Sequence, residues 1–172
     1  MNGCGIFDFR GDGMKALIKQ YFWFVSTLGI FGFGMVLVWS YELSEGAAWS
    51  LLVSGIRETP WEWMKPFAIV YILWVFIELS CLRPSLLRFV CSKIIGLQVF
   101  VWGAFLILTF LPLANYRYVM VCLMLLLSEC FSYQLYNSNK KYEWLFLPLM
   151  VSFVLLFFML LLFSVHPPKW IL

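Results

Sequence analysis

The stretch LMVSFVLLFFMLLLFSV, from Leu149 to Val165, decides the fold class. It carries no charged residue and no alternation of apolar with polar positions. A transmembrane β-strand would alternate in that way, because its side chains face lipid and lumen in turn. A helix of about 20 apolar residues crosses the hydrocarbon core of a bilayer and satisfies its backbone hydrogen bonds internally. The stretch therefore indicates a membrane-spanning helix.

The rest of the chain has the same character. Of its 172 residues, 63% are hydrophobic and only 12% are charged, whereas a soluble domain has about 25% charged residues. We predict an all-α, polytopic transmembrane bundle of about five spans. Residues 1–20 form an N-terminal segment, residues 21–172 form one bundle, and an outer interfacial loop covers residues 41–65. The predicted spans are Tyr21 to Ser40, Pro66 to Leu82, Ile94 to Pro112, Tyr118 to Tyr136 and Trp144 to Val165.

The distribution of basic residues predicts the orientation of the bundle. Short cytoplasmic loops carry an excess of Lys and Arg. If the N-terminus is inside, only Arg57, Lys65, Arg117 and Lys169 lie outside, and all other Lys and Arg residues lie on the cytoplasmic side. The sequence therefore predicts an inside N-terminus and an outside C-terminus.

Glycines in the first span indicate close helix packing. The segment GIFGFG places Gly29, Gly32 and Gly34 close together. Small residues allow two transmembrane helices to approach each other. The spacing differs from the G-x-x-x-G dimer motif, so it predicts close packing without specifying a dimer.

The segment RETPWEWMKP, residues 57–66, precedes the second span. Thr59 suits the N-cap of a helix, Pro60 the first helical position, and Glu62 the acidic position of a capping box. Aromatic and long basic side chains are typical of the membrane interface. On this basis Trp61, Trp63 and Lys65 are predicted interface anchors.

Several polar residues on the outer side form a candidate site. Carboxylates with a histidine are groups that bind cations or transfer protons. A single histidine falls short of the usual zinc ligand set, so we expect no metal. Because helix capping also accounts for part of this set, both interpretations stay open. The candidate residues are Glu42, Glu58, Glu62 and His166.

A second polar group lies within the predicted spans. Glu78 and Glu129 are intramembrane acids, which are costly and therefore indicate a function by default. Lys93 and Gln98 approach from the same side. One interpretation is a structural cluster that ties the spans together, and the other is a proton or ion relay. The structural interpretation is favoured, because no further deep polar residues link the two sides of the membrane.

Four local patterns have counterparts in one known group of proteins. Residues 57–65 (RETPWEWMK) correspond to the pattern N-E-S-V-W-E-H-L-K, and residues 38–42 (VWSYE) correspond to H-x-x-Y-E. Glu78 matches a recurrent acid, and residues 165–169 (VHPPK) correspond to F-Y-P-P-H. From about Met14 onward, the chain resembles an uncharacterised family of small five-span bacterial membrane proteins, known as a domain of unknown function. The resemblance implies a five-span fold, an outer polar cluster and a bacterial plasma membrane, and it supplies no activity.

This chain departs from that pattern at three positions where the family favours histidine. The residues here are Val38, Trp63 and Lys169. If those histidines and the acids form a metal or proton-transfer site in the family, the resemblance implies that this member has lost it.

Three functional hypotheses follow. The first is a non-catalytic bundle that binds another membrane protein or a lipid. The second is a membrane-embedded enzyme acting on a lipid-linked substrate at the outer interface, and the third is a small oligomeric transporter or channel. The chain contains no glycine-rich phosphate loop, no nucleophile elbow and no H-E-x-x-H motif, so the sequence leans against an enzyme. We expect no cofactor, no nucleic-acid partner, and the lipid bilayer as the surrounding medium.

Overall fold

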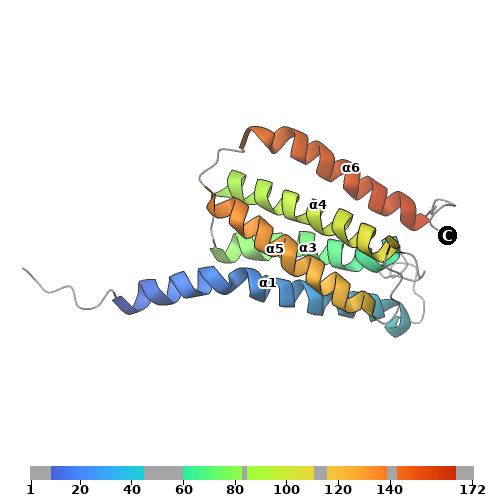
Figure 1. Ribbon diagram of the computed structural model, residues 1–172, viewed down its shortest axis with the longest axis horizontal. Helices are drawn as coiled ribbons and strands as arrows, with labels where there is room; N and C mark the ends of the chain where they lie inside the picture. The colour runs from blue at the N-terminus through green and yellow to red at the C-terminus, as the bar shows by residue number, and fades with distance from the viewer. Residues whose placement is uncertain (1–8, 45–59, 83–84, 111–115, 139–142, 166–172) are drawn as a thin grey trace, which may run out of the picture.

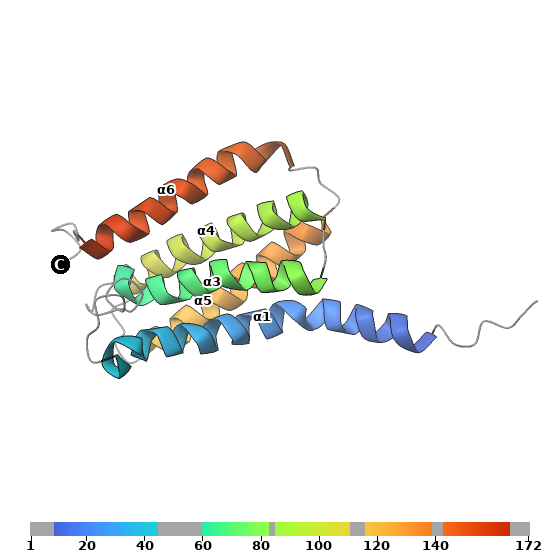
Figure 2. The same ribbon diagram turned by 180° about the vertical axis from the view of Figure 1, so that it is seen from behind.

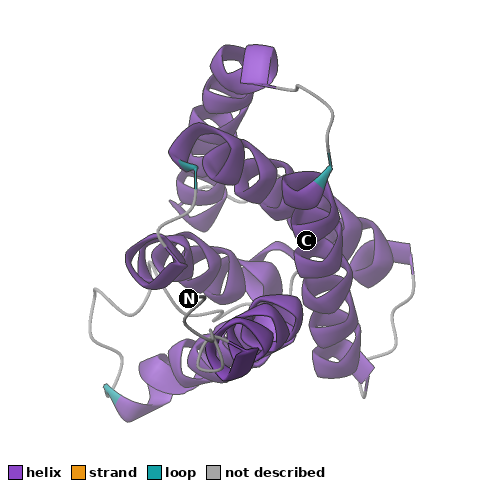
Figure 3. Cartoon of the chain, turned by 90° about the vertical axis from the view of Figure 1, so that its left-hand side faces the viewer, coloured by secondary structure: helices purple, strands orange, loops and turns teal. Residues whose placement is uncertain are grey.

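The computed structural model describes residues 9–44, 60–82, 85–110, 116–138 and 143–165. Within these ranges the regular elements are all helices, as Figure 3 shows. This confirms the predicted all-α bundle. The helices are α1 (Phe9–Leu43), α3 (Pro60–Leu82), α4 (Leu86–Phe110), α5 (Arg117–Asn137), the short 3-10 helix η2 (Glu143–Leu145) and α6 (Phe146–Val165).

Four of the helices are long and apolar enough to cross a membrane, which makes this a multi-pass membrane protein. The spans are Tyr21–Ser40, Pro60–Cys81, Leu86–Phe110 and Arg117–Asn137. Helix α6 has 20 residues, and its fully described part, Phe146–Met159, is apolar but by itself shorter than a full span. The crossing of a fifth helix therefore stays a prediction, as does the orientation of the bundle.

Two helices begin earlier than the hydrophobic pattern indicated. Helix α1 starts at Phe9, so residues 9–20 of the predicted N-terminal segment continue the first span as helix. Helix α4 starts at Leu86, well before Ile94. As a result, Lys93 lies inside a buried stretch of α4 and not at its entrance.

The start of α3 agrees with the helix signals of the sequence. Pro60 is the first helical residue, and Glu62 lies in the first turn. Thr59, the predicted N-cap, lies outside the described residues. The helix continues through Pro66 to Leu82. Pro60 and Pro66 therefore lie in its first turns, and neither of them ends the helix.

Helices α3 and α4 form the centre of the bundle (Figures 1 and 2). Helix α1 packs on α3 and α5, whereas α6 lies at the periphery against α4 and α3. Close contact between α1 and α3 depends on two glycines. A Cβ atom at Gly29 would overlap the ring of Trp74, and one at Gly34 would overlap the ring of Phe67. Gly32 has open space, so only two of the three glycines serve this contact.

Candidate functional site

Three charged side chains from three helices meet in the centre of the bundle. The Nζ atom of Lys93 on α4 lies 2.6 Å from Oε2 of Glu78 on α3. It also donates a hydrogen bond of 2.6 Å to Oε2 of Glu129 on α5. The side chains of Lys93, Glu78 and Glu129 are 9%, 1% and 1% exposed, so the group is shielded from lipid. We call these three residues the ion cluster.

Three hydroxyl groups surround the ion cluster. Ser26 on α1 donates a hydrogen bond of 2.5 Å to Oε1 of Glu78. The hydroxyl of Tyr71 on α3 lies beside the carboxylate of Glu129 and the hydroxyl of Ser132 on α5. All three hydroxyl-bearing residues are at most 1% exposed. The site thus draws polar groups from α1, α3, α4 and α5.

The helical periodicity explains why these side chains share one face of each helix. Residues seven apart lie two turns apart on the same face of a helix, as Tyr71 and Glu78 do on α3. Glu129 and Ser132 are three apart on α5 and share a face in the same way. Gly96 on α4, three residues after Lys93, completes the contact, because a Cβ there would lie 2.6 Å from the Tyr71 hydroxyl.

Sequence reasoning identified the charged members of the site and missed its hydroxyl groups. The seven-residue spacing of Tyr71 and Glu78 was a usable signal for one of them. Ser26 and Ser132 carried no such signal, because isolated serines are common in transmembrane helices and their partners come from other helices.

Gln98, which we expected in the same group, makes a different contact. Its Nε2 atom donates a hydrogen bond of 2.6 Å to Oγ of Ser152 on α6. Five residues separate Gln98 from Lys93, which turns the two side chains to different sides of α4. Gln98 therefore connects α4 to the peripheral helix.

A second buried ion pair lies near the start of α3. Lys65 Nζ donates a hydrogen bond of 3.0 Å to Oε2 of Glu62, one helical turn away. The two side chains are 2% and 6% exposed. The ion cluster, by contrast, joins side chains from three different helices.

Two of the predicted interface anchors are buried in the bundle. Trp61 and Lys65 are 5% and 1% exposed. The apolar ring of Trp61 packs edge-on against Phe105 of α4, and Lys65 forms an ion pair with Glu62. Their depth in the membrane stays a prediction.

Trp63 is half-buried and packs against the start of α5. Its ring lies edge-on to Tyr118, with 4.8 Å between the ring centroids. The guanidinium carbon of Arg117 lies 5.5 Å from the centroid of the Trp63 ring, a distance at which a cation is attracted to the ring face. Trp63 therefore joins α3 to the start of α5.

Most of the outer candidate site lies outside what the structure describes. Glu58 and His166 are outside the described residues, and for Glu42, in the last turn of α1, only the helical backbone is described. Glu62 is paired with Lys65. In the part of the chain that the structure covers, no three His, Cys, Asp or Glu side chains are grouped to hold a metal ion.

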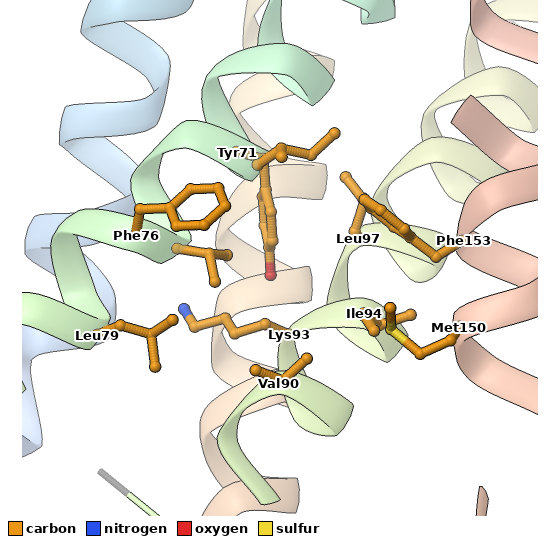
Figure 4. A pocket seen from close by; sticks show the side chains of 11 residues that line it. Tyr71, Phe76, Leu79, Val90, Lys93, Ile94, Leu97, Met150 and Phe153 are labelled. Carbon is orange, nitrogen blue, oxygen red and sulfur yellow. The ribbon is translucent and has the colours of Figure 1, made fainter. Parts of the chain in front are cut away.

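A cavity of about 210 Å³ lies between α3, α4 and α6, next to the ion cluster. Its lining is apolar except for Tyr71 and Lys93. Figure 4 shows the nitrogen of Lys93 turned toward α3, and Met150 and Phe153 of α6 opposite Ile94 and Leu97. The remaining lining residues are Ile72, Val75, Phe76, Leu79 and Val90.

Comparisons with known proteins give the chain no relative. No family model, no curated protein and no solved structure matches it. The resemblance to a five-span bacterial family therefore stays a prediction. Function is inferred from the ion cluster and the cavity.

Proposed function

We propose that this protein is a non-catalytic, membrane-embedded binding protein, and that its ligand is the hydrocarbon chain of a lipid-like molecule. The observation that carries the proposal is the apolar cavity between α3, α4 and α6. We place the protein in the bacterial plasma membrane, as the family resemblance implies.

The size and lining of the cavity support a hydrocarbon ligand. An apolar cavity of about 150 Å³ in a protein core holds one benzene molecule. The cavity here is larger, at about 210 Å³. Apolar walls offer few partners to water, whereas a stretch of alkyl chain restores the dispersion contacts that empty space lacks.

The position of the cavity supports a ligand that comes from the bilayer. The lining residues lie on the membrane-spanning helices α3 and α4 and on the apolar part of α6. The polar wall consists of Lys93, which is bound by Glu78 and Glu129. Because this ammonium is already neutralised, it gives no net attraction to an anionic headgroup. A headgroup would therefore remain outside while the chain enters.

A photoactivatable phospholipid with a diazirine in the middle of its acyl chain tests the proposal. The protein is reconstituted in vesicles that contain this lipid, irradiated and digested, and the labelled peptides are mapped. We expect labelling of the lining residues of α4 and α6. Val75→Phe fills the cavity and should remove that labelling.

A matched variant separates the cavity from the general lipid surface. Val36→Phe makes the same change at a 54% exposed position of α1 and should leave the labelling of the cavity unchanged. Equal labelling in both variants would show that only surrounding lipids react, and would contradict the proposal. Labelling that depends on a second protein would favour a partner-binding bundle instead.

The enzyme hypothesis gains no support from the described residues. Its acids and histidine include Glu42, Glu58 and His166, whose side chains are outside the description. It stays a prediction, with Glu62→Gln as its test. Gln can still cap the helix, but the substitution removes the carboxylate that Lys65 contacts. Loss of the cellular phenotype would therefore point to chemistry only in a Glu62→Gln protein whose unfolding midpoint matches that of the wild type.

A further inference from the structure

The ion cluster has one more acid than base. Two carboxylates, of Glu78 and Glu129, share the single ammonium of Lys93. If all three groups are ionised, the cluster carries a net negative charge in the interior of a membrane protein. An uncompensated charge is costly in that environment.

The hydrogen bonds identify which carboxyl group has an unused oxygen. Oε1 of Glu78 accepts the Ser26 hydroxyl, and Oε2 of Glu78 lies against the Lys93 ammonium. Both oxygens of Glu78 thus have a polar neighbour. Glu129 uses only Oε2 in its contact with Lys93. Its Oε1 atom is fully buried and has no hydrogen-bond partner among the described residues.

Two hydroxyl groups lie close to the carboxyl groups of the cluster. The hydroxyl of Tyr71 lies beside the carboxylate of Glu129 and the hydroxyl of Ser132. Both hydroxyls can donate as well as accept hydrogen bonds, so they do not decide which carboxyl group carries a proton. One proton shared by the two carboxyl groups would leave a single negative charge opposite the Lys93 ammonium and remove the excess.

We propose that Glu78 and Glu129 share one proton in the folded protein, and that the ion cluster is thereby a proton-binding site inside the membrane. The titratable and charged groups that face Glu129 are Tyr71 and Glu78 from α3 and Lys93 from α4, and α1 contributes the hydroxyl of Ser26. This inference is independent of the lipid-binding proposal, because it concerns charge balance and not the cavity.

Infrared spectroscopy of the full-length protein in nanodiscs tests the presence of the proton. A protonated carboxyl group has its own C=O stretching band, which shifts in D₂O. We expect this band at neutral pH and its loss in Glu129→Gln, because that variant leaves one base for one acid. Glu62→Gln is the matched control and should keep the band. Absence of the band from the wild-type protein at neutral pH would overturn the proposal.

A second pair of variants tests where the proton lies. Tyr71→Phe removes an acceptor beside Glu129 and should move the band to the higher frequency of a carboxyl group with fewer hydrogen bonds. Ser26→Ala removes a contact of Glu78 and should leave the frequency unchanged. The opposite result would place the proton on Glu78. A band that neither variant shifts would belong to a group outside the ion cluster and would contradict the proposal.

The pH dependence of unfolding supplies an independent measurement. A protein that binds one proton more when folded than when unfolded loses stability as pH rises, by about a tenfold change in the folding constant per pH unit. Glu129→Gln should remove this slope. If the stability at constant ionic strength depends instead on the Na⁺ concentration, and the slope is unchanged in Glu129→Gln, a metal cation balances the charge and the proposal is wrong.

Discussion

Lys93 is the residue on which the charge balance of the bundle depends. The substitution Lys93→Met keeps the length of the side chain but leaves Glu78 and Glu129 facing each other without an ammonium group. Breaking a buried ion pair by removal of one partner costs about 3–5 kcal/mol. We expect a loss of stability in this range, measured by denaturation of the purified protein in detergent. Wild-type stability of Lys93→Met would contradict the role of Lys93 as a counter-charge.

Gly96 tests how closely α4 and α5 pack at the same level. A Cβ at this position would lie 2.9 Å from Cβ of Ser132 and 3.2 Å from the backbone oxygen of Ser128. The helices would have to separate, and overpacking of this kind costs about 1–3 kcal/mol. We expect Gly96→Ala to lower the unfolding midpoint. The control is Gly32→Ala, which meets no atom within 4 Å and should cost nothing.

At the scale of the elements, α6 is the helix with the weakest attachment. The hydrogen bond from Gln98 to Ser152 is its polar link to α4, and interhelical hydrogen bonds in membranes contribute about 0.6 kcal/mol on average. We expect Ser152→Ala to loosen α6 by about this amount. Hydrogen exchange of the α6 backbone should then become faster while exchange in α4 stays the same.

A serine on a neighbouring helix provides the comparison for this experiment. The Ser80 hydroxyl bonds to the Phe76 carbonyl within its own helix, so Ser80→Ala removes a hydroxyl without removing a contact between helices. Faster exchange in α6 of both variants would show that the effect does not come from the contact with Gln98.

The helices could be predicted from the sequence, and so could the charged residues of the site, but for different physical reasons. Apolar runs predict spans because lipid leaves few alternatives to a helix, and α5 accordingly agrees closely with the prediction. The start of α4 was predicted too late in the sequence, because the charged residues Arg88 and Lys93 indicated a segment outside the membrane. Lys93 is accommodated by acids from two other helices, and no local pattern contains that information. The burial of Trp61 and Lys65 depends on tertiary packing for the same reason.

At the scale of the whole molecule, the orientation in the membrane is the prediction that a simple experiment can decide. The distribution of Lys and Arg favours an inside N-terminus, and five crossings would then place the C-terminus outside. Alkaline phosphatase fused after Leu172 should therefore be active, and a fluorescent protein at the same place should be dark. The reverse result would show either the opposite orientation or an even number of crossings, in which case α6 does not span.

The ion cluster also has a consequence for biogenesis. Glu78 near the end of α3 and Lys93 near the start of α4 are separated by a short connection. The two helices can therefore enter the membrane as a hairpin whose opposite charges are already paired. Helix α5 follows with a further acid, Glu129, and a charged residue at the centre of an inserting helix costs about 2.5–3.5 kcal/mol on translocon scales. We therefore expect the insertion of α5 to be the step of synthesis most sensitive to substitutions at Lys93, with unassembled chains then directed to membrane proteases.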